Sequence, residues 1–345
     1  MELGERKQKI LCAIIEDYIR TGEPVGSKVL VQRLDNAVSS ATIRNEMAEL
    51  CSLGYLEQPH TSAGRVPTAK AFRLYIDKLM RRRPLPEESR RDIDAVLEKS
   101  AGDPEQLMES ASEVLSEATG YAAVTTTPLK EGACVRRVAL LPVSSRSVAL
   151  LLMTSSGVLR SRVCRLPQDV DPDVLEQMAN ALTAAFVGMP LSSIGLADVQ
   201  GLLLSLGENA LQCAPLLTAF LELVQASAEA EVLLSGQLNL LRHPDYAPEN
   251  ARSLLGFLSQ REQLVGMLAA HTGGLRVVLG SESLRPELNG SSLIVTRYAP
   301  RQGDTGTMGL IGPQRMDYAA AISRLEYVAN VVGRLLGRLL EEDEE

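Results

Sequence analysis

The stretch SSATIRNEM, residues 39–47, decides the fold of the N-terminal part of the chain. Its two serines are good helix caps, and apolar residues follow at Ile43, Met47 and Leu50. This spacing of three and four residues predicts an amphipathic helix, which glycine chemistry ends at Gly54. The apolar stripe of such a helix must face a core that other elements supply.

The segments on either side of this helix supply that core. Helical spacing of apolar residues predicts one helix over residues 5–20, ended by a Gly-Glu-Pro turn, and a short second helix over 28–34 capped by Ser27. After Gly54, two short extended runs flank the turn HTSAG at residues 60–64, which predicts a two-stranded hairpin. Three helices followed by a hairpin are the order of a winged helix.

The polar side of the third helix is a candidate DNA-reading surface. In helix–turn–helix proteins the N-terminal part of the second helix of the motif contacts base edges in the major groove. Arg44 can donate two hydrogen bonds to guanine, and Asn45 can pair with adenine. The hydroxyls of Ser40 and Thr42 at the helix start suit phosphates. The alternative is an ordinary solvated helix face.

The hairpin adds a second candidate contact. His60, Ser62 and Arg65 lie in or beside its turn, where a wing follows the DNA backbone or enters the minor groove. The alternative is an exposed turn whose serine and glycine have no further role.

The charge distribution agrees with a DNA-binding N-terminal part. The 345 residues carry a net charge of −8, but the chain through Arg91 holds 16 basic and 12 acidic residues, a net +4, which leaves −12 for the remainder. A basic unit joined to an acidic body is typical of proteins in which one domain contacts phosphates.

Several function classes are disfavoured by what the sequence lacks. The five cysteines are dispersed without a CxxC pair, and the three histidines are not at metal-ligand spacing. No apolar run reaches the roughly 18 residues of a membrane span, and no signal peptide begins the chain. The glycines in residues 306–312 fit neither a P-loop nor a dinucleotide motif, and no catalytic set is recognisable. We therefore expect a cytoplasmic protein without a metal, cofactor or enzymatic activity.

The rest of the chain reads as α+β. Strand patterns occur at 135–143, 147–153 and 157–165, and again at 275–279, 293–298 and 307–311, with Leu/Ala-rich helical spacing between them. The expected units are a winged helix with the helix after it, a linker and helix, a sheet domain in two pieces, and an inserted, mainly helical segment: 1–83, 84–103, 104–170 with 271–345, and 171–270.

Long motifs at both ends of the chain resemble the HrcA heat-inducible transcription repressors. The matching stretches are GEPVGSK at 22–28, SSATIRNEM at 39–47, GYL at 54–56, PHTSAGRVPT at 59–68 and MGLIGPQRMDY at 308–318. The run Ala71-Phe72-Arg73 stands where that family usually has Gly-Tyr-Arg, and the middle of the chain, 171–270, shows little to match.

The resemblance implies a winged-helix repressor that binds double-stranded DNA, an inverted-repeat operator called CIRCE, as a homodimer and silences chaperone operons. It also implies a GAF-like sheet domain, an inserted dimerising segment and assistance from the chaperonin GroEL. The protein would then be cytoplasmic and associated with the nucleoid when bound to its operator.

Two alternatives remain open at this point. The sheet domain could hold a small ligand, which would make the protein a metabolite-responsive winged-helix regulator. The C-terminal helix, residues 317–340, has a heptad-like seam that could pair with a dimer mate. We expect it instead to cover its own sheet, because its apolar stripe is wider than a coiled-coil seam.

Overall fold

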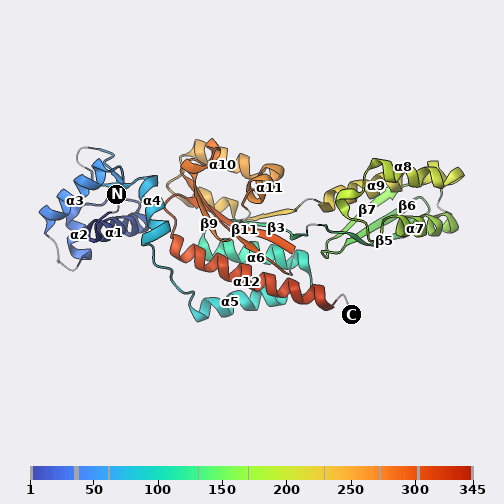
Figure 1. Cartoon of the computed structure of the whole chain (residues 1–345), viewed down its shortest axis with the longest axis horizontal. Coiled ribbons are helices and arrows are strands. Elements are labelled where there is room, and N and C mark those ends of the chain that lie inside the picture. The colour runs from blue at the N-terminus through green and yellow to red at the C-terminus, as the bar shows by residue number, and fades with distance from the viewer. Residues whose placement is uncertain are drawn as a thin grey trace.

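The computed structural model describes residues 3–34, 39–60, 63–130, 132–169, 171–228, 230–271, 273–300 and 304–342. The molecule is elongated, as Figure 1 shows, with a small helical module at one end, a sheet-containing body in the middle and a second α/β unit at the other end.

The N-terminal module is the winged helix that the sequence predicts. It consists of α1 (Glu5–Thr21), α2 (Ser27–Arg33), α3 (Ser40–Ser52), β1 (Leu56–Glu57) and β2 (Val66–Pro67). Ser39 caps α3, since its Oγ accepts a hydrogen bond from the Thr42 N–H at 3.2 Å. The expected cap Ser27 was wrong: Gly26 holds the cap position of α2, and the Ser27 hydroxyl lies 3.2 Å from that of Ser40.

The chain then crosses from the winged helix to the body through a short helical segment and an extended stretch. The crossing comprises α4 (Ala69–Leu74), a π-helical turn (Tyr75–Leu79) and an extended stretch before α5 (Glu87–Lys99). Leu85 is buried in that stretch, and Ser323 of α12 (Tyr318–Glu342) donates a hydrogen bond to the Arg83 carbonyl at 2.6 Å. The expected linker is therefore packed onto the body.

The body is built on an antiparallel six-stranded sheet. Its strands run in the order β8-β3-β11-β10-β9, with the short β4 pairing with the start of β11. The strands are β3 (Ala122–Thr126), β4 (Leu129–Lys130), β8 (Val232–Ser235), β9 (Arg276–Leu279), β10 (Ser291–Tyr298) and β11 (Asp304–Pro313).

Helices cover both faces of this sheet. On one face lie α5, α6 (Pro104–Thr119) and α12, and on the other lie α10 (Pro248–Leu258) and α11 (Arg261–Ala269), as Figure 1 shows. The first of these cores is continuous with that of the winged helix, because one buried cluster runs from Ile10 of α1 to Leu336 of α12.

The unit at the far end, residues 132–228, is inserted between β4 and β8, and we call it the insert. It has a separate three-stranded sheet and three longer helices: β5 (Val135–Ser144), β6 (Ser147–Thr154), β7 (Leu159–Arg165), α7 (Pro172–Phe186), α8 (Leu196–Ser205) and α9 (Ala210–Ala228). One face of its sheet packs on α7 and α9 through Val148, Leu150 and Leu152.

These boundaries differ from the expected ones. We placed the strands at 135–165 in the body and residues 171–270 in the insert, but β5–β7 belong to the insert, and β8, α10 and α11 belong to the body. Local periodicity identifies a strand but not the strand with which it pairs, and the six-stranded sheet is closed by partners far apart in the chain, such as Thr126 and Val232.

The C-terminal helix packs within its own chain, as we preferred. Ile322, Leu325, Val332 and Leu336 of α12 are all buried in the core shared by the body and the winged helix. The glycine run at 306–312 lies in β11, where a Cβ on Gly306 would overlap the Tyr298 ring at 2.2 Å. These glycines therefore serve packing.

Among the described residues, α9 is long and apolar enough by length and composition to cross a membrane, with a mean hydropathy of 1.2. Cys213, Leu217 and Phe220 of this helix are buried against the rest of the insert. We interpret α9 as the core helix of the insert.

Candidate nucleic-acid interface

Helix α3 presents the polar side chains of Arg44 and Asn45 to solvent. Arg44 and Asn45 are exposed, while Ile43, Met47 and Leu50 face the core of the module. Within the described part of the chain, neither Arg44 nor Asn45 has a hydrogen bond or ion pair, so both are available to an external partner. This is the arrangement that base-edge contacts need.

Ser40 and Thr42 are half-buried at the start of the same helix and already have protein partners. The Thr42 hydroxyl lies 2.9 Å from that of Ser39, and the Ser40 hydroxyl faces Ser27. The first contact lies within the first turn of α3, and the second joins that turn to α2. A hydroxyl can donate one hydrogen bond and accept others, so phosphate contact is still compatible with this geometry.

Acidic residues on α3 are neutralised from within the module. Glu46 and Glu49 lie 3.4 and 3.1 Å from the Lys7 ammonium, and Arg6 lies 3.8 Å from Glu46. The hydrogen bond to Glu49, followed by that to Glu46, raises the pKa of Lys7 above its ordinary value. Basic residues at the start of α1 thus offset carboxylates that would repel DNA phosphates.

A buried carboxylate joins the first two helices. Asp17 of α1 is 4% exposed, and its Oδ1 accepts hydrogen bonds from Arg20 at 2.6 Å and from Arg33 of α2 at 3.1 Å. A buried charge is costly without partners, so this pairing fixes α2 relative to α1. Because α3 packs on both helices, the pairing also supports the position of α3.

The wing is held tightly at its base. Arg65 and Val25 exchange two backbone hydrogen bonds, each 2.9 Å long, and a Cβ on Gly64 would meet the Val25 carbonyl oxygen at 2.5 Å. Arg65 is half-buried here, its Nε is buried without a hydrogen-bond partner, and its Nη1 lies 3.5 Å from the Gly64 carbonyl.

The remaining wing candidates lie further out. His60 is exposed at the end of the first hairpin arm, whereas Ser62 lies outside the described residues. The hairpin therefore brings Arg65 to the base of the wing and His60 toward its tip.

Two basic residues were missed at the sequence level. Lys28 is exposed at the start of α2, directly after Ser27, which contacts Ser40. The helix dipole favours cations at the other end of a helix, so an exposed lysine in the first turn was the signal that would have found it. Arg73 of α4 pairs with Glu282 of the body, and no local pattern could reveal a partner 209 residues away.

The histidines of the body have structural partners. His243 stacks on Tyr121, and its Nε2 lies 3.1 Å from the Gly120 carbonyl, while His271 Nδ1 lies 2.7 Å from the Met267 carbonyl. Over the described ranges, no group of three or more His, Cys, Asp or Glu side chains is placed to hold a metal ion.

Comparison with known proteins gives two family matches that together cover most of the chain. Residues 2–79 match the winged helix-turn-helix transcription repressor, HrcA DNA-binding family, and residues 105–322 match the HrcA protein C terminal domain family. The "Heat-inducible transcription repressor HrcA" of Desulforudis audaxviator is 34% identical over 98% of this chain and 99% of its own length. That of Acetivibrio thermocellus is 31% identical over 99% of both chains.

A solved structure shares the fold. The crystal structure of a protein described only as hypothetical aligns with a TM-score of 0.68 and 24% identity, covering 98% of this chain and 100% of that one.

Proposed function

Because the chain belongs to the HrcA family of heat-inducible transcription repressors, we propose that it silences class I heat-shock chaperone operons by binding the inverted-repeat CIRCE operator as a homodimer. The observation that carries this proposal is the recognition helix α3, which holds Arg44 and Asn45 exposed and unpaired in the described part of the chain.

The proposal assigns distinct roles to the residues of the interface. Arg44 and Asn45 read bases, because their side chains are free and can form bidentate contacts. Ser40, Thr42, His60, Ser62 and Arg65 contact phosphates and the minor groove and so position the module on the duplex. The exposed Lys28 joins this second group.

We place the dimer contact on the insert. On the sheet face turned away from α7 and α9, Leu141 and Val163 flank Ala149 in one cross-strand row, 52% and 63% exposed. An open row of apolar residues on a sheet is a surface that a partner would cover. An inverted repeat needs a two-fold protein, and this face supports a second copy as that partner.

The proposal also assigns a role to the body, and it states where and with what assistance the protein works. We propose that it is the GAF-like domain of the repressor, that the chaperonin GroEL assists its active form, and that the protein works in the cytoplasm at the nucleoid. We assign it no catalytic activity.

A gel shift tests the function directly. Purified protein is mixed with a duplex that carries the inverted repeat, with and without GroEL, and with a duplex in which both half-sites are scrambled. We expect binding to the first duplex that GroEL enhances, and binding to the scrambled duplex that is at least 10³-fold weaker. Equal affinity for both duplexes would contradict the proposal.

A pocket favours a second candidate function, a metabolite-responsive regulator. A cavity of about 340 Å³ lies where the body meets the insert, between Met108, Leu233 and Leu336 on one side and the β6–β7 turn on the other. Arg160 lines it and has a buried Nε without a hydrogen-bond partner, although its Nη1 pairs with Glu231 at 3.1 Å. The volume suits a small molecule with an apolar body and one acceptor.

Thermal-shift screening separates the two candidates. A compound that raises the melting temperature of the wild type but not of Leu336→Phe, and that also changes operator affinity, would establish the metabolite-responsive function. If the screen finds no such compound and GroEL enhances binding in the gel shift, the chaperonin rather than a metabolite would be the regulator of operator binding.

A further inference from the structure

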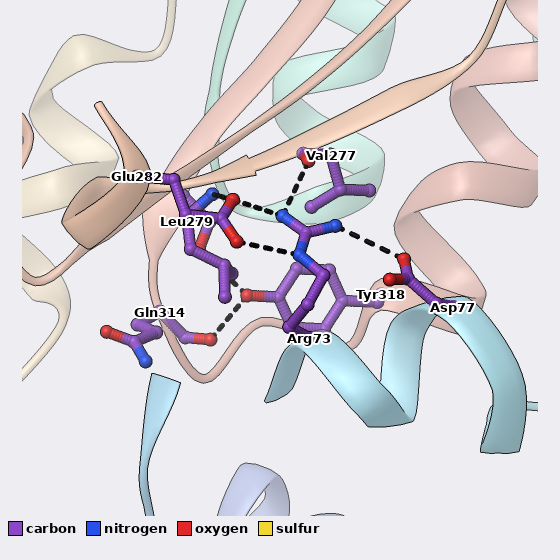
Figure 2. Close-up of polar contacts among 8 residues, drawn as sticks. Arg73, Asp77, Val277, Leu279, Glu282, Gln314 and Tyr318 are labelled. Carbon is purple, nitrogen blue, oxygen red and sulfur yellow. Dashed lines mark hydrogen bonds and ion pairs between the residues drawn. The ribbon is translucent and has the colours of Figure 1, made fainter. Parts of the chain in front are cut away.

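Arg73 of α4 reaches out of the winged helix into the body, as Figure 2 shows. Its Nε donates to Glu282 Oε1 at 2.7 Å, and its Nη2 pairs with the other oxygen of the same carboxylate. The same Nη2 donates to the Val277 carbonyl at 2.9 Å, and Nη1 lies 3.3 Å from Asp77 of the winged-helix side. A guanidinium that holds a carboxylate with two nitrogens is fixed in direction as well as in position.

The target of this contact is the edge of the body's sheet. Strand β9, which contains Val277, is the outermost strand of the six, so one side of its backbone has no neighbouring strand among the residues that the structure describes. Arg73 binds the outward carbonyl of Val277, and Glu282 accepts the N–H of Leu279 at 3.1 Å. The ion pair thus binds backbone groups that a further strand would otherwise bind, and it covers an edge that is liable to pair with another chain.

Two further contacts hold the winged helix in the same orientation. The ring of Phe72, next to Arg73, lies 6.2 Å from that of Tyr318 between centroids. Arg315, in the turn before α12, donates to the Ile19 carbonyl at 3.1 Å in the last turn of α1 and also pairs with Asp245. Since α3 packs on α1, these contacts fix the recognition helix relative to the body.

We propose that Arg73 is a positioning residue for operator binding, which locks the winged helix onto β9 through Glu282 and so sets the distance between the two recognition helices of a dimer. The inference rests on the proposed function, binding of an inverted repeat by a homodimer. Arg73 itself contacts no DNA in this proposal. Its effect reaches the DNA only through the orientation of the module that carries Arg44 and Asn45.

A rigid attachment has a measurable signature. Two linked modules gain about 10²–10⁴ in avidity over one, but only while their separation matches that of the half-sites. A protein whose modules are locked must therefore discriminate between the natural spacer and spacers changed by a few base pairs. A protein whose modules are loosely attached must lose this discrimination while each module still binds a half-site.

The experiment compares full-length wild type with Arg73→Ala on three duplexes: the inverted repeat, the same repeat with two base pairs added to its spacer, and a single half-site. Fluorescence anisotropy gives the affinities. We expect Arg73→Ala to bind the natural repeat roughly tenfold more weakly, to lose most of the spacer preference and to bind the half-site as wild type does. Arg91→Ala is the matched control, because Arg91 pairs with Glu87 on the exposed surface of α5 and does not join the two units.

A second variant guards against misfolding. Glu282→Gln keeps the size of the side chain and an acceptor for Leu279, and it changes the body's partner in the contact rather than the winged-helix side. It should lose spacer preference as Arg73→Ala does, and the double variant should lose no more than either alone. An unchanged spacer preference in both variants, or an equal loss on the half-site and on the full repeat, would overturn the proposal. Wild type that fails to bind every duplex would instead refute the proposed function.

Discussion

The two ends of the molecule are attached to its body in different ways. The winged helix shares a core with the body, and polar contacts such as Arg73–Glu282 and Arg315–Ile19 reinforce the junction. The insert has its own core, in which the rings of Phe186 and Phe220 lie 4.7 Å apart between centroids. A unit with a separate core can open by itself, whereas a shared core opens as one.

This difference bears on how a repressor is built. The end that reads DNA must keep its orientation, since a small rotation at the junction moves α3 by several ångströms at the duplex. The end proposed to carry the dimer contact must hold two copies together, and it does so on a unit with a separate core. Figure 1 shows how far apart these two ends lie.

The largest expected effect tests whether the insert unfolds separately. Phe220→Ala removes a ring that is fully buried in the insert core, which should cost about 3–5 kcal/mol. Leu336→Ala, in the core shared by the winged helix and body, should cost about 2–5 kcal/mol. In calorimetry we expect two transitions, with each variant shifting a different one. A single transition that both variants shift equally would show that the cores are coupled.

The Leu336→Ala variant also tests how the C-terminal helix α12 packs. Because Leu336 packs within its own chain, Leu336→Ala should lower the melting temperature while the folded protein stays dimeric. A folded monomer in analytical ultracentrifugation would contradict this.

The next effect concerns the open sheet face of the insert. Val163→Asp would place a carboxylate in the proposed dimer contact and should weaken dimerisation by about 2 kcal/mol or more, with folding intact because the side chain is exposed. The matched control is Leu204→Asp on α8, which is 83% exposed and outside the sheet face. Equal sedimentation of both variants as dimers would place the contact elsewhere.

The sequence predicted the winged helix far better than the other end. The apolar stripe at Ile43, Met47 and Leu50 fits one helix orientation only, with these three residues facing the core. That orientation correctly placed Arg44 and Asn45 on the exposed side. Helices α1 and α12 were equally readable, because one face of each is apolar over many turns.

The patterns at 275–279, 293–298 and 307–311 correctly predicted β9, β10 and β11, but β3 and β8 of the same sheet were harder to predict for physical reasons. Strand β3, residues 122–126, is buried on both faces and so shows no alternation, and β8 is four residues long inside a Leu-rich stretch. Membership of a sheet depends on distant partners, which is also why the Arg73–Glu282 contact was invisible. The separate sheet of the insert was missed for the same reason.

A smaller effect is expected at the DNA-reading end. Arg44→Ala and Asn45→Ala should each cost about 1–3 kcal/mol in operator binding and relax specificity at one base pair, because each loses a bidentate contact. Arg65→Ala should weaken binding to all sequences alike and lower the slope of affinity against salt by about one. Binding titrations at several salt concentrations check both. None of the three variants should change dimerisation. A shift to monomer would contradict the assignment of DNA reading to the winged helix and of the dimer contact to the insert.

The smallest effect is a pH dependence confined to the junction of winged helix and body. Burial raises the pKa of Glu282, but the hydrogen bonds from Arg73 and from the Leu279 N–H, with the charge of Arg276 nearby, outweigh it and leave the pKa below its ordinary value of 4.5. A carboxyl group whose pKa is lower in the folded state stabilises that state fully above the ordinary pKa. Its contribution is lost as the pH falls through the lowered value.

Wild type should therefore lose stability more steeply than Glu282→Gln below about pH 4.5, by roughly 0.2–1 kcal/mol because the pair is partly exposed. Calorimetry from pH 6 to pH 3.5 measures this, with Glu87→Gln, from the exposed Arg91 pair, as the control. The difference should fall on the transition of the shared core and leave that of the insert unchanged, since Glu282 touches only the former. If both melting temperatures shifted equally, the stability of the insert would also depend on the Arg73–Glu282 junction. The winged helix, body and insert would then unfold cooperatively.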